Sequence, residues 1–507
     1  MFIWRLIGEP FRLLLVPLLF SSENSLSFPA QILLITFSTF SIITLISLIY
    51  STFIRQTRVV PIAEKRQKLS VGTRFLAKKV AGLLRGGVEG LSRPLPDKGE
   101  SQAEIIERIN QFRPVEKGEI LVGGMDLRAM AEKIRENCAR FLYANPLHFD
   151  VVPGSLLLEN ELISMAIHAF SGEALRGPRP MGIVTQSLEE SAVMGLTSFR
   201  EHSRKKGIAN PSVIIYSDVP PIFHKAAYRV NMKTKQVSSI SELNSSISPS
   251  TSCIVVSCVS RLYGEETPIE SIASTLRARG VNAGIFLYRS WESGVRNATF
   301  GFKTPEVSAI AWVPLPLRIS PGSSGVLLYK GSDIAKESIF VSSKWNGGVY
   351  ATPSVPGSRS AASSAFIAGL ICLIGRERLD ALGTRSTQVA KLIAEFLRQK
   401  GWEIYKEPQG NVLVFKGDKG TFLRKALKKK GIDLQFISPE GWLRLEVCIE
   451  KSEEIYRNFI EAVNGDLHTD ADGHVENWYL NGIEIEGIKA DDLGEFAKEV
   501  IVQLHQC

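Results

Sequence analysis

Short apolar runs alternate with helical patterns through the middle of the chain. Buried strands are predicted at residues 212–216, 253–256, 283–288, 309–312 and 325–329. Helices are predicted at 158–169 and 223–232, and a third should open with a capping box at Thr267–Glu270, with Pro268 at its first position, and run to Gly280. Apolar strands joined by helices are typical of a mainly parallel sheet covered on both faces, so the sequence predicts an α/β fold.

A second, smaller α/β domain is predicted towards the C-terminus. It follows a long helix at residues 385–400. Its order is strand, strand, helix, strand, helix, at residues 402–405, 411–415, 422–430, 443–448 and 453–463. Residues 465–480 are interpreted as a polar insertion, and a last helix is predicted at 491–504.

The N-terminal part of the chain predicts a single membrane span. No charged residue occurs from Asn24 to Ile54, and about 20 apolar residues are enough to cross a bilayer as a helix. Six basic residues follow within residues 55–74, whereas only Arg5 and Arg12 precede the span. The positive-inside rule therefore predicts that the C-terminal part lies in the cytosol. A signal peptide is disfavoured because the run is long and has no clear cleavage site.

Composition and simple motifs narrow the function by exclusion. The 507 residues carry 60 Lys and Arg against 52 Asp and Glu, a net charge of +8 with no basic stripe interleaved with aromatic residues, so no nucleic-acid partner is predicted. The six cysteines are scattered without a C-x-x-C pair, which disfavours a zinc ribbon and suits a reducing compartment. The histidines lack metal-ligand spacing, so no metal is predicted, and common nucleotide and hydrolase motifs are missing.

Two segments carry a more specific signal. Residues 143–154 read YANPLHFDVVPG, and residues 345–359 read WNGGVYATPSVPGSR. Both blocks closely resemble segments of the sphingosine-1-phosphate lyases, a membrane-anchored branch of the group II pyridoxal-phosphate-dependent decarboxylases. By this resemblance the chain is identified as a divergent member of that family.

The resemblance implies a fold-type-I, aminotransferase-like scaffold in a homodimer, with active sites at the subunit interface. It also implies a single-pass protein of the endoplasmic reticulum membrane that faces the cytosol. Active members cleave a phosphorylated long-chain base into phosphoethanolamine and a fatty aldehyde. The predicted domains are a lumenal segment (1–24), a transmembrane helix (25–54), a basic juxtamembrane helix and linker (55–124), a dimer-interface segment (125–180), a large cofactor-type α/β domain (181–375) and a small C-terminal α/β domain (376–507).

Two departures concern groups that the cofactor requires. The family lysine that holds pyridoxal phosphate as a Schiff base falls on Pro316, and no lysine occurs between Lys303 and Lys330. The family aspartate, which keeps the pyridine nitrogen protonated, falls on Phe286. Neither a proline nor a phenylalanine can perform those roles.

Two further departures concern how the cofactor is held. The stacking histidine falls on Pro220, and His224 lies about one helical turn further on, where a structural role is predicted. The glycine-rich phosphate cradle is replaced by Ser187, Leu188 and Glu189, and the carboxylate of Glu189 would repel a dianion. No cofactor is therefore expected, although pyridoxal phosphate would be required if the chain is an active lyase.

Four family residues remain in the matching blocks. Asn145 and His148 match residues near the substrate phosphate, and Tyr350 and Arg359 match a loop that reaches the neighbouring site across the dimer. One interpretation is that they now maintain the dimer interface and turn geometry, as the turn-forming glycines and prolines around them indicate. The other is that they still bind a phosphorylated lipid.

Three functional hypotheses follow. The first is a catalytically inactive lyase-like membrane protein that acts as a regulatory or partner subunit in sphingolipid metabolism, as a homodimer or as a heterodimer with a lyase relative. The second is an active pyridoxal-phosphate-dependent lyase whose site lies elsewhere in the chain. The third is a membrane scaffold unrelated to sphingolipids.

Overall fold

The computed structural model describes the chain in separate stretches. They are residues 136–148, 150–171, 180–290, 301–314, 325–437, 441–447, 452–465, 477–480 and 483–486, with single residues at 101, 134 and within 494–501. The predicted membrane span at 25–54, the linker at 55–124 and most of the insertion at 465–480 lie outside them. In the part that is described, no helix is both long and apolar enough to cross a membrane.

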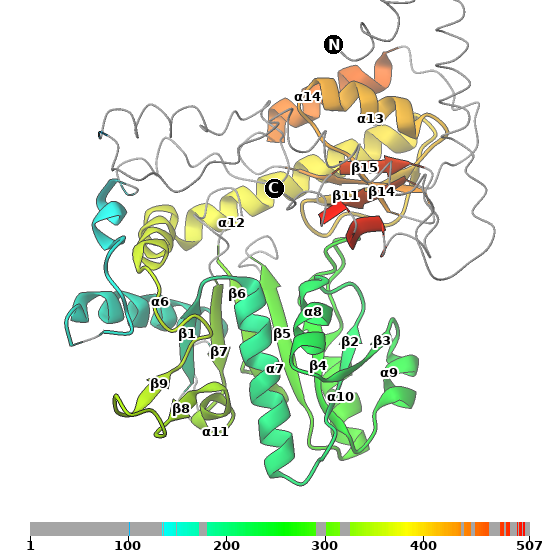
Figure 1. Ribbon diagram of the computed structural model, residues 1–507. Helices are drawn as coiled ribbons and strands as arrows, with labels where there is room; N and C mark the ends of the chain where they lie inside the picture. Colours follow the sequence, from blue (N-terminus) through cyan, green and yellow to red (C-terminus); the bar gives the residue numbers. More distant parts are fainter. Residues whose placement is uncertain are drawn as a thin grey trace, which may run out of the picture. The chain divides into compact units, whose positions relative to one another are not determined.

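A seven-stranded mixed sheet forms the centre of the larger unit, residues 108–474 (Figure 1). The strand order is β1-β7-β6-β5-β4-β2-β3, in which neighbouring strands from β6 to β3 are parallel and β7 is antiparallel to both β6 and β1. The strands are β1 (Met181–Thr185), β2 (Ser212–Tyr216), β3 (Lys233–Val237), β4 (Thr251–Ser257), β5 (Gly284–Ser290), β6 (Val307–Val313) and β7 (Gly325–Tyr329). The prediction of a mainly parallel sheet is confirmed, with β7 as the exception.

Helices cover both faces of this sheet because its strands are apolar on both sides. Their bounds are α6 (Pro153–Ser171), α7 (Leu188–Lys205), α8 (Ile222–Arg229), α9 (Ile240–Ser246), α10 (Ile269–Arg279) and α11 (Ser332–Ala335). One buried cluster joins α7, α8 and α11 to alternate strand residues, and the other joins α6, α9, α10 and the first part of α12 (Ala362–Gln399) to the remaining ones. The two clusters define a three-layer α/β/α arrangement.

The capping box predicted at Thr267 is wrong in its detail. Helix α10 begins at Ile269, and its N-cap is Pro268, which has no side chain able to cap the helix. The carboxylate of Glu270 instead pairs with Arg277 at 2.5 Å. Thr267 is buried, and its backbone N–H donates a hydrogen bond to the carbonyl of Cys258 at 3.0 Å. This bond holds Thr267 next to the end of β4.

A smaller α/β part follows helix α12. Helix α12 is interrupted at Gly375, where φ is +69°. The antiparallel sheet of this smaller part has the order β10-β11-β13-β12. The elements are β10 (Glu403–Ile404), β11 (Val412–Lys416), α13 (Gly420–Lys429), β12 (Gln435–Ile437), β13 (Trp442–Glu446) and α14 (Ser452–Asn464). The predicted strands and helices of this domain are confirmed, and β12 is an addition to them.

Two short hairpins complete the described elements. Strand β8 (Phe340–Ser342) pairs with β9 (Tyr350–Thr352) beside the large sheet. Strand β14 (Asn477–Leu480) pairs with β15 (Ile483–Glu486), and this hairpin belongs to the second compact unit of the chain. The four cysteines in the described part, Cys138, Cys253, Cys258 and Cys372, are all free.

Candidate functional site

Helix α7 begins where the resemblance places the phosphate cradle. Its N-cap, Ser187, accepts a hydrogen bond from the backbone N–H of Glu190 at 3.1 Å. The Glu190 carboxylate accepts one from the backbone N–H of Gln186, the residue before the N-cap, at 2.7 Å. Its other oxygen accepts a hydrogen bond from the backbone N–H of Val355 at 2.9 Å. The chain itself therefore bonds N–H groups that a phosphate cradle would leave free for a ligand.

Leu188 and Glu189, which follow the N-cap, make the start of α7 still less suited to an anion. The carboxylate of Glu189 lies 2.6 Å from the Lys225 ammonium and 3.5 Å from the Arg229 guanidinium, both on α8. Leu188 packs against the buried apolar cluster between α7, α8 and the sheet. An anion at this point would meet a carboxylate, and the two nearby cations are already engaged with that carboxylate.

Phe286, where the resemblance places the family aspartate, lies in the middle of β5 and is fully buried. Its ring packs edge-on against Phe223 of α8, with centroids 5.5 Å apart, and lies 5.8 Å from the Phe199 ring of α7. It also touches the backbone of α7, because a Cβ added at Gly195 would overlap the ring. The ring therefore fills the space between the sheet and two helices.

Pro220 lies at the turn that leads from β2 into α8. Its carbonyl accepts a hydrogen bond from the backbone N–H of Phe223 at 3.0 Å, so it forms part of the helix start. The side chain of His224 is exposed, whereas Phe223 beside it is fully buried. The fold thus brings Phe286 and Leu188, at the start of α7, to one apolar cluster, and it leaves His224 exposed on α8.

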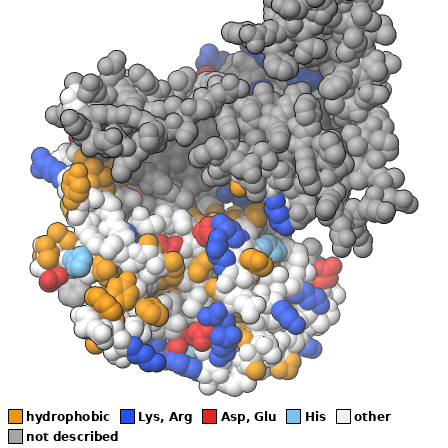
Figure 2. Space-filling model, viewed as in Figure 1, with side chains coloured by type: hydrophobic (Ala, Val, Ile, Leu, Met, Phe, Trp, Pro, Cys, Tyr) orange, Lys and Arg blue, Asp and Glu red, His pale blue; other side chains and the backbone are white. Residues whose placement is uncertain are grey.

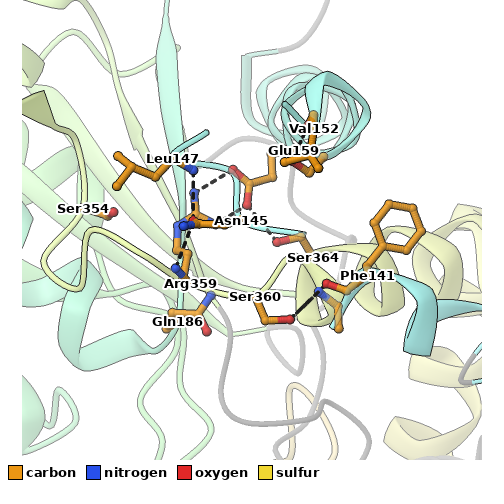
Figure 3. A network of polar contacts seen from close by, with 12 residues as sticks. Phe141, Asn145, Leu147, Val152, Glu159, Gln186, Ser354, Arg359, Ser360 and Ser364 are labelled. Carbon is orange, nitrogen blue, oxygen red and sulfur yellow. Dashed lines mark hydrogen bonds and ion pairs between the residues drawn. The ribbon is translucent and has the colours of Figure 1, made fainter. Parts of the chain in front are cut away.

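A buried ion pair dominates the other matched segment (Figure 3). The guanidinium of Arg359 donates two hydrogen bonds to the two carboxylate oxygens of Glu159 in α6, one of them at 2.7 Å. Both side chains are buried, at 7% and 4% exposure. Ser364 donates a third hydrogen bond to Glu159 at 3.0 Å. Because this guanidinium is committed to a carboxylate, it is not available to a phosphate group without breaking the pair.

Asn145 joins the two matched blocks through the backbone. Its side-chain oxygen accepts hydrogen bonds from the backbone N–H groups of Leu147 and Arg359, both at 3.2 Å (Figure 3). His148 contributes turn hydrogen bonds through its backbone, and its side chain is exposed. Tyr350 lies in β9, where its ring is 6.3 Å from Phe340 and 37% of the residue is exposed. These contacts hold turns together.

The described residues do not fit pyridoxal phosphate. Phe286 offers no charge to a pyridinium and occupies its surroundings with an aromatic ring. The start of α7 is capped by Ser187 and Glu190, and Glu189 adds a negative charge. Pro316, where the resemblance places the lysine, lies outside the described residues. No reaction step that depends on this cofactor can be derived from these positions.

Three residues that shape this region were not predicted from the sequence. Glu190 could have been found, because Ser187 and Glu190 have the S-x-x-E spacing of a capping box. Glu159 is an ordinary acidic residue in a helical pattern, and its partner is 200 positions away. Gly195 matters only because the Phe286 ring presses against it. No local sequence pattern identifies Glu159 or Gly195.

Solved structures place the fold in a class. A sphingosine-1-phosphate lyase from Burkholderia pseudomallei has a TM-score of 0.64 at 19% identity, covering 75% of this chain and 94% of that one. A glutamate decarboxylase from Lactobacillus brevis has a TM-score of 0.61 at 14% identity, covering 75% and 95%. The chain therefore has the α/β fold of the pyridoxal-phosphate-dependent decarboxylases.

Sequence relatives point to one kind of lyase. The chain is 27% identical over 290 residues to sphingosine-1-phosphate lyase 1 of Rattus norvegicus, covering 53% of this chain and 50% of the relative. It is 28% identical over 295 residues to the sphingosine-1-phosphate lyase of Drosophila melanogaster, covering 53% of each. No family model matches the chain. The chain is thus similar in sequence to sphingosine-1-phosphate lyases, and it spans about half the length of these relatives.

Proposed function

We propose that this chain is a catalytically inactive member of the sphingosine-1-phosphate lyase family that acts as a partner subunit in sphingolipid metabolism. The observation that carries the proposal is the burial of Phe286 between β5, α7 and α8. A lyase of this family needs a carboxylate at that place, and the surrounding side chains Phe199 and Phe223 would leave a carboxylate without a partner.

Other parts of the site agree with this proposal. At the start of α7, the side chains of Ser187 and Glu190 accept hydrogen bonds from the backbone N–H groups of Glu190 and Gln186, so these two donors are not free for a phosphate. The carboxylate of Glu189 opposes an anion there. The sequence has no lysine between Lys303 and Lys330. Each feature removes a different requirement of the chemistry, so restoring a single residue should not restore cleavage.

The partner role is supported by a group of exposed apolar side chains around the β8–β9 hairpin. We call this group the hairpin surface: Phe340, Val341, Trp345, Val349 and Val355, which are 58–71% exposed. Exposed apolar residues gathered in one region are typical of association sites. The segment overlaps the block that the resemblance assigns to the dimer loop, and a stable interface of this kind should bury more than about 2,000 Å². We infer assembly as a homodimer or with an active lyase relative.

The proposed location is the endoplasmic reticulum membrane, with the folded part in the cytosol. It is supported by the uncharged run up to Ile54 and the basic residues that follow. A phosphorylated lipid remains a candidate ligand of the Asn145 and Arg359 region, although the Glu159 pair makes a role in turn geometry the better supported interpretation.

The test of inactivity is a direct search for bound cofactor. Full-length protein, purified with added pyridoxal phosphate, should show no visible aldimine band, and borohydride should fix no cofactor to it. An active lyase prepared in parallel is the positive control. The variant Pro316→Lys should remain unable to cleave sphingosine phosphate. A cofactor band, or cleavage above background by the unmodified protein, would establish the active-lyase alternative instead.

The test of partnership is co-purification with an active lyase relative. Trp345→Ser should reduce the recovered partner and the fraction of dimer, because it removes an exposed aromatic from the hairpin surface. Tyr228→Ser, which removes an 85% exposed aromatic from α8, is the matched control and should change neither. A chain that runs as a monomer at micromolar concentration and recovers no lyase would favour the scaffold alternative.

A further inference from the structure

Helix α13 carries an unbalanced group of positive charges. Lys425, Lys428 and Lys429 are exposed, and Lys419 is exposed at the N-cap. Residues three and four positions apart lie on one helix face, with Cβ atoms about 5–6 Å apart. We call Lys425, Lys428 and Lys429 the lysine ridge.

The opposite face of α13 fixes the direction of the ridge. Leu423 and Leu427 are fully buried in the core of the small sheet and its helices. Arg424 is buried as well, and its Nε donates a hydrogen bond to the Leu434 carbonyl at 2.8 Å. Because these side chains hold the helix on its domain, the lysines extend away from the protein.

The ridge lacks the acidic partners that other lysines in this chain have. Among the described residues, no carboxylate forms an ion pair with it, whereas Lys430 next to it lies 2.8 Å from Glu461 of α14. Figure 2 shows one face of the molecule, on which basic side chains lie among acidic ones. Other lysines of the described part form ion pairs, as Lys225 does with Glu189 and Lys205 with Glu337. The ridge is therefore uncompensated.

Helix stability does not explain the ridge. Cations in the last turn, such as Lys428 and Lys429, interact favourably with the carbonyl end of a helix. Lys425 lies a turn earlier and has a like charge at both i+3 and i+4, an arrangement that destabilises a helix. Its ammonium lies 5.6 Å from the half-buried Phe422 ring, so apolar surface accompanies the charge.

We propose that the lysine ridge binds the anionic surface of a phospholipid membrane. Several ammonium groups fixed on one exposed helix face match an extended array of headgroups, whereas a single small anion could contact only some of them. The membrane anchor of the proposed function would keep the ridge near such a surface. Each lysine near an anionic leaflet should strengthen binding about fivefold, and the three together about 100-fold.

The test is lysine labelling on the full chain reconstituted in vesicles. Vesicles of phosphatidylcholine alone are compared with vesicles that also contain phosphatidylserine, and an amine-acylating reagent is read out by mass spectrometry. The ridge lysines should be labelled at least about fivefold more slowly on the anionic vesicles, and high salt should abolish the difference. Lys233 and Lys235, exposed on strand β3, are the internal control and should be labelled equally on both.

A matched pair of variants tests the ridge itself. In the double variant Lys425→Gln/Lys428→Gln, the affinity for anionic vesicles should fall about 25-fold. Lys429 should then be acylated at the same rate on both vesicle types. Lys233→Gln/Lys235→Gln should leave the slower labelling of Lys429 on anionic vesicles unchanged. Equal labelling of the ridge on both vesicle types overturns the proposal. Stronger protection by transfer RNA or polyglutamate than by anionic vesicles also overturns it and assigns the ridge to a nucleic acid or an acidic protein.

Failure of this proposal can be told apart from failure of the proposed function. A cofactor band would refute inactivity without changing the labelling of α13. A chain that alkaline carbonate extracts from membranes would refute the anchor, and protection of the ridge by anionic vesicles would still support headgroup binding.

Discussion

The substitution Phe286→Asp introduces a carboxylate where the resemblance places the family aspartate, and it tests whether a cofactor site persists around that position. In this structure the change removes an aromatic ring that packs against Phe199, Phe223 and the backbone at Gly195. Truncating a buried phenylalanine costs about 3–5 kcal/mol. Burying a carboxylate without a partner adds several kcal/mol, so we expect a total loss of at least about 5 kcal/mol.

Thermal unfolding of the full chain, followed by circular dichroism, measures the effect. A loss of this size should lower the Tm of the large domain by about 10 °C or more. Phe286→Leu, which keeps an apolar side chain, is the control and should lower it by only a few degrees. Burial should raise the pKa of the introduced carboxyl, so the difference should shrink as pH falls towards about 4, and below that pH the group is neutral in both the folded and the unfolded state.

The reasoning is falsified if Phe286→Asp melts within about 2 °C of the unmodified protein, a shift that corresponds to less than about 1 kcal/mol. That result would mean that the space around β5 is open to water or to a ligand. Binding of pyridoxal phosphate by the variant would lead to the same conclusion.

Three other predictions concern stability and topology. Arg359→Ala leaves Glu159 buried without its counter-charge and should lower the free energy of unfolding by about 3–5 kcal/mol, as measured by thermal unfolding. The double variant Arg359→Met with Glu159→Leu should recover most of that loss. An Arg359→Ala variant as stable as the unmodified protein would contradict the burial of the pair. Burial raises the pKa of Tyr329 to about 12, above the value of about 10 in an unfolded chain, so its contribution to stability is complete below about pH 10 and is lost as pH rises towards 12. Tyr329→Phe should flatten the stability profile over that interval, and an unchanged profile would refute the assignment. The acceptor sequences at Asn244 and Asn297 should carry no glycan in a cytosolic domain, so a gel shift with endoglycosidase would overturn the orientation.

Local pattern was sufficient for most of the sheet. Strands β2 and β7 have the bounds that their apolar runs predict. Strands β4 and β6 extend theirs by two residues at the start and one at the end, and β5 begins one residue later than predicted and ends two residues later. A strand such as β3, with the sequence KTKQV, was missed because four of its five residues are exposed at the sheet edge. Edge strands carry charge rather than a buried apolar run, so periodicity does not reveal them.

The resemblance to sphingosine-1-phosphate lyases, and the prediction that their cofactor residues are replaced, also come from sequence alone, because they depend on which residue types stand in the matched blocks. What only the tertiary structure decided is how the remaining residues are used. The direction of β7 is set by its partners β1 and β6, and the pairing of Arg359 with Glu159 joins positions 200 residues apart. The apolar packing around Phe286 and the hydrogen bond from Val355 to Glu190 likewise depend on distant segments. Such contacts arise when the folded sheet brings these segments together, and no local pattern of side chains encodes them.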